Sequence, residues 1–412
     1  MGRNRKDISA TSKVAGSLSF AAIGTAVPRK AVEEEIAKAG RKERRVRALP
    51  ASVVVYYTMA MCIYWHTGVE EVLRWVLEEA RKLFGAEEVK VASSGAISSA
   101  RKRLGGGVLE ALYRRLAQPL ARKETAGAWH RGLLPVALDG STLDLQDTAA
   151  NAGRFGRPGA SRGEAAFPQL RFVTLVEAGT HVLFGARMGA CGESEQALAA
   201  EVVASSLREG MLCMADRLFY GYGFWAAARG TGAHLLWRVK SNLRLPVEER
   251  LADGSYLSTV YADEKGRRRG LGGQRVRVVE YRLKGGGAPP ETYRLMTTLL
   301  DHAEHPAVEL ARLYPRRWEV ETTYDEFKTH LRGGRVVLRS KTPELVRQEF
   351  YAFLLTHYCL RRMMHEAALA NGVPPLRLSF THAVQTLRRK LPAYQAGFSP
   401  SGRTAPPQGD RP

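Results

Sequence analysis

Short apolar runs that alternate with helix-forming stretches limit the fold of this chain more than any other feature, and they lie between residues 131 and 239. The runs at 133–138 and 211–215 each have the length of one buried strand and are too short for a helix. Between them the sequence predicts a hairpin that turns at residues 178–180, followed by an alanine-rich helix at 194–207. A further strand is expected at 233–239. Strands and helices in this order predict an α/β core.

The chain is too long for one domain. Its 412 residues exceed the roughly 250–300 residues at which a single hydrophobic core stops growing. Alternating apolar and polar residues, punctuated by glycine clusters, predict an insertion built only of β-strands. We expect six segments: a basic N-terminal arm at 1–47, a helical domain at 48–130, a first core part at 131–239, the β-strand insertion at 240–300, a helical second core part at 301–370, and a C-terminal segment with a disordered tail at 371–412.

The helical domain ends in a short basic helix. Ser93 can cap its first turn, and Gly105 is expected to end it. Arg101, Lys102 and Arg103 cluster at its C-terminal end. Two further helices precede it, at 51–65 and 69–84, so the segment suits a helix-turn-helix-like DNA reader. An ordinary three-helix bundle with a solvated basic end explains the same pattern equally well.

The charge of the chain indicates a polyanionic partner. Sixty-two Lys and Arg residues against 41 Asp and Glu residues give a net charge of +21. Nucleic acid and an anionic membrane surface both fit this charge. No apolar run reaches the ~18 residues that cross a bilayer, and no signal-peptide pattern follows the first residues, so we expect a cytoplasmic protein. The four cysteines form no Cys-x-x-Cys pair and predict neither a zinc site nor a disulfide framework.

Two aspartates follow the two apolar runs directly. Asp139 comes after the first run and Asp216 after the second, and Glu321 lies on a predicted helix further along the chain. Ligands bind beyond the carboxyl ends of strands in an open α/β sheet, and three carboxylates gathered there would repel one another without cations. Hard oxygen donors favour Mg²⁺ or Mn²⁺, and a pair of such ions about 3.5–4 Å apart suits attack on a phosphodiester. Alternatively, Asp139 belongs to a turn and Asp216 caps a helix.

Basic residues lie on both sides of Glu321 in the sequence. Pro315 is expected to begin a helix and to hold Tyr314 outside helical conformation. Arg317, Glu321 and Lys328 then share one helix face, which suits a passing phosphate backbone. A solvated charged helix with an Arg–Glu pair is the alternative interpretation.

These residues resemble a known motif. Tyr314, Arg317, Glu321 and Lys328 have the Y-x2-R-x3-E-x6-K spacing of the insertion-sequence transposases of the IS-4 group. The segments 138–142 and 215–219 are similar to the two aspartate motifs of that group and occur in the same order. The chain therefore resembles a DDE transposase of the IS-4 family over roughly residues 45 to 370.

The resemblance implies both the fold and the site. It implies a ribonuclease-H-like catalytic core with an all-β insertion and an N-terminal helical DNA-binding domain. Asp139, Asp216 and Glu321 would hold two Mg²⁺ ions, for which Mn²⁺ could substitute. The group also stacks a flipped base on an aromatic residue of the insertion; Tyr293 is the expected residue, with Trp237 as the alternative. The residues implied for DNA contact are Tyr314, Arg317, Lys328, Arg101, Lys102 and Tyr293.

The implied activity is cut-and-paste transposition. Metal-dependent hydrolysis at the terminal inverted repeats would free a 3′-OH, which would then attack the opposite strand to form a hairpin and later target DNA. Double-stranded DNA is the expected partner, with a homodimer holding two ends together and the protein associated with the bacterial nucleoid. A DNA-binding repressor or inactive remnant, a non-transposing nuclease of the same fold and, more distantly, a membrane-surface protein are the alternatives.

Overall fold

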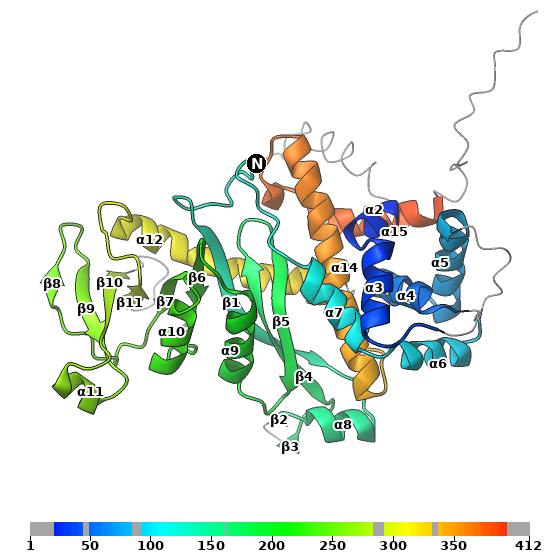
Figure 1. Ribbon diagram of the computed structural model, residues 1–412, viewed down its shortest axis with the longest axis horizontal. Coiled ribbons are helices and arrows are strands. Elements are labelled where there is room, and N and C mark those ends of the chain that lie inside the picture. The colour runs from blue at the N-terminus through cyan, green and yellow to red at the C-terminus, as the bar shows by residue number, and fades with distance from the viewer. Residues whose placement is uncertain are drawn as a thin grey trace, which may run out of the picture.

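The computed structural model describes residues 20–43, 49–84, 92–160, 163–282, 292–331 and 337–393. Figure 1 shows a central sheet with helices gathered at one end and the insertion strands at the other. Within the described residues, no helix is both long and apolar enough to cross a bilayer.

Five strands form the centre of the sheet in the order β5-β4-β1-β6-β7. β4 is antiparallel to both β1 and β5, whereas β6 and β7 run parallel to β1. The parallel connections pass through helices, as right-handed crossovers require. The elements of this core are β1 (Leu134–Asp144), β4 (Gln169–Glu177), β5 (Val182–Ala190), α9 (Glu195–Ser206), β6 (Met211–Ala215), α10 (Tyr222–Arg229) and β7 (His234–Arg238). The predicted α/β core is thereby confirmed in its element order.

The first strand is longer than predicted. It was expected to end at Asp139, but β1 continues to Asp144 because β4 stays paired with it along that length. The parallel pairing of β1 with β6 does stop at Leu138, which lies opposite Ala215. A short helix and a two-stranded hairpin follow β1: α8 (Ala149–Phe155), β2 (Gly159–Ala160) and β3 (Gly163–Glu164).

The insertion does not form a separate all-β unit. Its strand β11 pairs antiparallel with β7, so the insertion extends the central sheet to nine strands. It also contains a short helix, whose first turn is capped by the Asp263 side chain accepting from the Gly266 amide at 2.6 Å. The prediction of an insertion made only of strands was therefore wrong. Its elements are β8 (Glu249–Arg250), β9 (Tyr256–Val260), α11 (Glu264–Arg269), β10 (Gln274–Arg282) and β11 (Thr292–Thr297).

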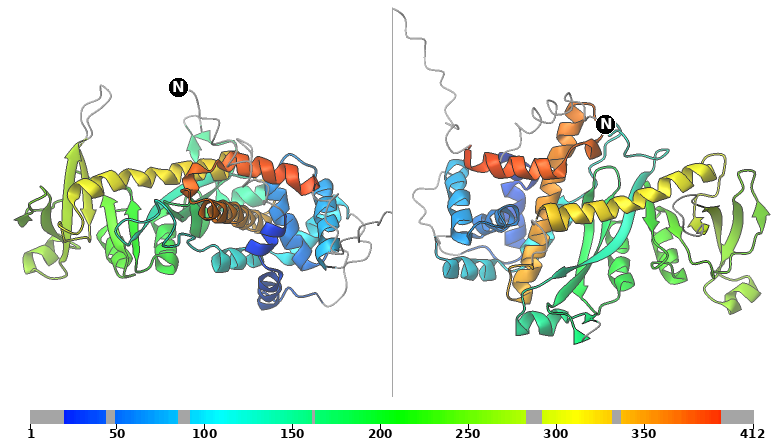
Figure 2. Two further views of the ribbon diagram at one scale, coloured as in Figure 1. Left: turned by 90° about the horizontal axis from the view of Figure 1, so that it is seen from above. Right: turned by 180° about the vertical axis from the view of Figure 1, so that it is seen from behind.

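A long helical rod crosses the sheet on the face opposite α9 and α10 (Figure 2). Pro315 lies inside this rod and does not begin it, and Tyr314 has helical dihedral angles (φ −55°, ψ −38°), contrary to the prediction. Proline lacks an amide hydrogen, and the chain responds locally with a tighter 3₁₀ turn. The rod consists of α12 (Ala307–Leu313), the 3₁₀ turn η1 (Tyr314–Trp318), α13 (Glu319–Asp325) and the π-helical turn η2 (Glu326–His330).

The helical end of the molecule is built around α14 (Pro343–Ala370), which packs against α4, α7 and β5. The N-terminal helices and the sheet therefore share one hydrophobic core. The remaining helices are α2 (Phe20–Ala26), α3 (Arg29–Lys38), α4 (Ala51–Ile63), α5 (Val69–Phe84), α6 (Ser94–Leu104), α7 (Gly107–Leu116), η3 (Pro375–Arg377) and α15 (Phe380–Ala393). The C-terminal segment thus contains a helix, and the predicted tail from 397 onward lies outside the described residues, as do residues 1–19 and 44–47 of the N-terminal arm.

Candidate active site

The first two acids lie side by side at the end of the parallel strands. Because Leu138 pairs with Ala215, the next residues, Asp139 and Asp216, occupy matching positions on β1 and directly after β6. Each carboxylate is held by the amide of the following residue. Gly140 N donates to Asp139 Oδ1 at 2.9 Å, and Arg217 N donates to Asp216 Oδ1 at 2.6 Å. The strand register therefore brings together two acids that are far apart in the sequence.

Two buried tyrosines fix the rod to these strand ends. The Tyr314 hydroxyl donates to the carbonyl of Ala215 at 3.2 Å. The Tyr324 hydroxyl donates to the carbonyl of Asp139 at 2.7 Å. Tyr314 was expected to contact DNA, but it is almost fully buried and supports the residue before Asp216 instead. Tyr324 was missed; its only signal in the sequence is its position three residues after Glu321, on the inward face of α13.

Arg317 links Asp139 to the third acid. Its Nη1 lies 3.6 Å from Asp139 Oδ2, and its Nη2 lies 4.0 Å from Glu321 Oε1. Arg317 is nearly buried, whereas the Glu321 side chain is 68% exposed. The rod therefore places Glu321 near the edge of the sheet where Asp139 and Asp216 lie. Within the described residues, however, no three acidic, imidazole or thiol groups converge closely enough to hold a metal ion.

The surroundings of Asp139 suit a bound cation. Burial raises the pKa of Asp139 to about 6, against the lowering effects of the Gly140 amide and Arg317. The carboxylates of Glu195 and Asp216 raise it further. A divalent cation would relieve both the burial of the charge and the repulsion between the carboxylates. Carboxylate oxygens are also the donors that Mg²⁺ prefers, so the residues present fit such an ion.

Lys328 lies further along the same face of β1. Its Nζ donates to Ser141 Oγ, and Ser141 points to the same face of the strand as Asp139. The ammonium also lies 5.9 Å from the ring centroids of Phe172 and Tyr324. Arg317 and Lys328 thus follow β1 together, in agreement with the predicted shared helix face.

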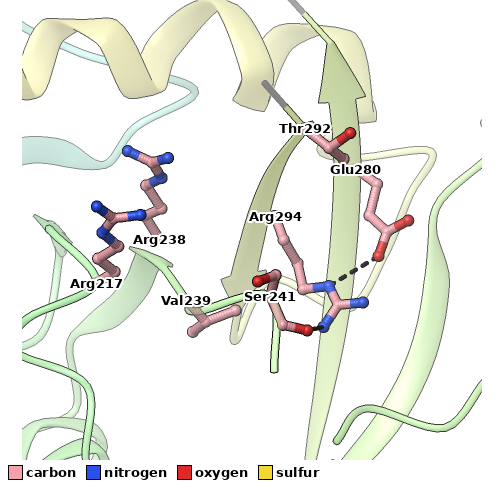
Figure 3. A pocket seen from close by; sticks show the side chains of 7 residues that line it. All are labelled: Arg217, Arg238, Val239, Ser241, Glu280, Thr292 and Arg294. Carbon is pink, nitrogen blue, oxygen red and sulfur yellow. Dashed lines mark hydrogen bonds and ion pairs between the residues drawn. The ribbon is translucent and has the colours of Figure 1, made fainter. Parts of the chain in front are cut away.

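A cavity lined by arginines opens beside Asp216, between the end of β6 and the insertion (Figure 3). Arg217 and Arg238 lie on one side of it, and Arg294 on the other. The Arg238 guanidinium sits 4.1 Å from the ring centroid of Tyr293, which stacks on Tyr281 at 5.3 Å. These arginines were missed because only the sheet topology brings β7 and β11 to this edge.

The alternative stacking residue, Trp237, does not fit a contact with DNA. It is fully buried and packs edge-on against Trp225 at a centroid distance of 5.2 Å. Tyr293, in contrast, is only partly buried. Of the two aromatic candidates in this region, Tyr293 is therefore the one within reach of a ligand.

Arg101 does not lie on a DNA-contacting surface. It is 8% exposed, its Nε donates to Gln348 Oε1 at 2.7 Å, and its Nη2 donates to Ser340 Oγ at 3.1 Å. The side chain points inward because position 101 shares the buried face of α6 with Ile97. The prediction of Arg101 as a DNA contact is corrected: it joins α6 to α14. Lys102, the next residue, is exposed.

A buried ionic network anchors the π-helical turn that carries Lys328. Glu326 pairs with Arg361 of α14 and lies 3.1 Å from Nδ1 of His181, in the β4–β5 turn. His181 Nε2 is 2.9 Å from Glu319 Oε2. Burial by itself would raise the pKa of Glu326, but Arg361 and the neighbouring histidines hold it well below its usual range. The network connects the rod to the β4–β5 hairpin and to α14.

Two family models match this chain. The family model of the transposase DDE domain matches residues 131–359, more than half of the chain, and that of the insertion element 4 transposase N-terminal region matches residues 17–114. Transposase InsG for insertion sequence element IS4, from Escherichia coli (strain K12), is 29% identical over 371 residues, which cover 89% of this chain and 81% of the relative.

A solved piggyBac transposase, in a synaptic complex with hairpin DNA, has a similar fold. Its TM-score is 0.50 at 10% identity, and the match covers 94% of this chain and 87% of that chain. The two family models and the similarity to transposase InsG lead to one conclusion: the chain belongs to the IS4 family of DDE transposases.

Proposed function

We propose that this transposase moves an insertion sequence by cut-and-paste, through metal-dependent hydrolysis and strand transfer at the terminal inverted repeats. The observation that carries the proposal is the matched position of Asp139 and Asp216 on parallel strands, with Glu321 joined to Asp139 through Arg317. The central strand order, three antiparallel strands followed by two parallel ones, supports a ribonuclease-H-like core.

Asp139, Asp216 and Glu321 would hold two Mg²⁺ ions, with Mn²⁺ able to substitute. Bound ions of this kind activate the attacking oxygen and stabilise the leaving oxygen. The Glu321 side chain is largely exposed and can rotate towards the aspartates without disturbing the core. Tyr314 and Tyr324 hold the backbone of the two strand ends in place while charge develops at the phosphate.

The cations around this edge suit a DNA end. Arg317 and Lys328 would position the scissile phosphate along β1, and the cavity arginines would bind the backbone beside it. Tyr293, next to that cavity, would stack an extruded base. The N-terminal helices would bind the repeat, and a homodimer would hold two ends together. Such a protein would act in the cytoplasm, at the nucleoid.

The test is a reaction with a DNA fragment that carries the inverted repeats flanking the gene. We expect Mg²⁺-dependent cleavage at the repeat and joining of the freed end to a target plasmid, and EDTA should stop both. A fragment with a scrambled repeat is the control. Cleavage without joined products would indicate a nuclease of the same fold, whereas binding without cleavage would indicate a repressor or inactive remnant.

The neighbours Arg101 and Lys102 should give opposite results. We expect Lys102→Ala to weaken binding to the repeat and reduce its salt slope by about one, with little effect on stability. Arg101→Met should instead lower stability by roughly 1–3 kcal/mol, because Gln348 and Ser340 lose a buried charged donor. Filter binding at several salt concentrations and urea denaturation measure the two effects. If the Arg101→Met protein is as stable as the unchanged protein but its affinity for the repeat depends less on salt concentration, the structural role of Arg101 is contradicted.

A further inference from the structure

A carboxylate outside the motif spacing lies against β1 beside Asp139. Glu195 is the first residue of α9, directly after the capping Ser194. A Cβ atom built on Gly140 would clash with Glu195 Oε1 and lie 2.7 Å from its Cδ. Glu195 therefore occupies the space that any side chain at position 140 would take.

Gly140 opens the strand to this charge. Successive residues of a strand point to opposite faces, so Asp139 faces the rod while position 140 faces α9. Because Gly140 has no side chain, the Glu195 carboxylate lies directly against the strand backbone at the residue that follows Asp139. Among the neighbouring carboxylates, Glu195 raises the pKa of Asp139 more than Asp216 does, and it also contributes to the raised pKa of Tyr324 on the rod.

Two further carboxylates act on Asp139 at this edge, those of Glu195 and Asp216. Arg317 is the cation paired with Asp139, at 3.6 Å. Among the ion pairs formed by the described residues, none within 4.0 Å involves Glu195. Carboxylate oxygens gathered at one strand end are the hard donors that a divalent cation prefers.

We propose that Glu195 is a fourth acidic residue of the metal site, contributing a carboxylate from the N-terminus of α9 next to Asp139. The inference rests on the proposed metal-dependent function and extends it to a residue that the Asp-Asp-Glu pattern leaves out. It also gives Gly140 a specific purpose, because the missing side chain makes room for this carboxylate.

The test is a calorimetric titration of Mn²⁺ into the full-length protein without DNA. We expect Glu195→Gln to weaken Mn²⁺ binding roughly 10-fold or more, because the amide keeps the shape but not the charge. Glu201→Gln, a change of the same kind on the same helix, should bind Mn²⁺ as the unchanged protein does, since Glu201 pairs with Arg187 at 3.3 Å. Asp139→Asn should also weaken binding.

A second variant perturbs Glu195 without removing it. Gly140→Ala places a methyl group where the carboxylate lies, and the flexible end of Glu195 can yield without disturbing the sheet. The Gly140→Ala change should weaken Mn²⁺ binding on its own, and it should reduce the affinity of the Glu195→Gln protein little further. If the losses of affinity from the two changes add up in the double variant, they do not both act through Glu195, and the inference is contradicted.

The outcomes separate this inference from the proposed function. Unchanged Mn²⁺ affinity in Glu195→Gln, with affinity lost in Asp139→Asn, would overturn the inference and leave the function standing. Unchanged affinity in both, or no binding by the unchanged protein, would overturn the metal site as well. A lower melting temperature of metal-free Glu195→Gln with unchanged affinity would assign Glu195 to stabilising the α9 dipole and would also overturn the inference.

Discussion

Replacing Asp139 with asparagine should leave a protein that binds the terminal repeat and does not cut it. The expected loss is roughly 1,000-fold or more in cleavage rate, because a metal-binding carboxylate supplies several kcal/mol of charge stabilisation to the transition state. Asparagine has nearly the same shape, and its carbonyl can still accept from the Gly140 amide, so the strand should keep its geometry. Single-turnover cleavage of a labelled repeat, alongside a gel-shift measurement of binding, separates the two properties.

Asp144, on the same strand, provides a matched control. It lies five residues beyond Asp139 and accepts a hydrogen bond from Gln169 Nε2 at 2.6 Å. Asp144→Asn should cleave at close to the normal rate. An Asp139→Asn protein that cuts as fast as Asp144→Asn would refute the assignment of Asp139, and equal losses in both would point to damage of the sheet.

Arg361→Met should destabilise the protein by roughly 3–5 kcal/mol, which is the usual cost of breaking a buried ion pair from one side. The reason is that Glu326 would keep its charge in the core without the guanidinium that balances it. A second change, Glu326→Gln in the same chain, should recover part of the loss, because it removes that charge. Urea denaturation of the folded protein measures both effects.

The adjacent arginine tests whether burial is the cause. Arg362 pairs with Glu366 at 3.1 Å, one turn away on the partly exposed side of α14. Arg362→Met should cost no more than about 1 kcal/mol, as surface pairs usually do. Equal urea midpoints for the two arginine variants would mean that the network adds no stability.

Local patterns in the sequence predicted much of this molecule. Ser93 caps α6 and Gly105 follows its last residue, as their residue types indicate. The two aspartates and the Tyr-Arg-Glu-Lys spacing identified the edge of the sheet and the rod that meets it. These features depend on residues that are close together in the sequence. They depend either on direct neighbours or on a helical spacing that places side chains on the same face of a helix.

The features that were missed depend on contacts between distant segments. Nothing around Arg101 indicates that it will meet Gln348 on α14, and nothing around Glu195 indicates that it will lie against Gly140. The insertion was expected to be independent because alternating apolar and polar residues predict strands but do not indicate which strands they pair with. Pro315 was misjudged because tertiary packing keeps the rod helical across a residue that usually ends or begins a helix.

The pairing of β11 with β7 sets the distance between Asp216 and Tyr293, two residues of the proposed DNA site. β7 lies directly between β6, which ends before Asp216, and β11, which carries Tyr293. Two strand spacings, about 10 Å in total, therefore separate these two strands. The hydrogen-bonded strands would therefore fix the distance between the proposed cleavage site and the proposed base-stacking residue. Changes in the length of the insertion loops would leave this distance unchanged, whereas a shift in the register of β11 against β7 would move Tyr293.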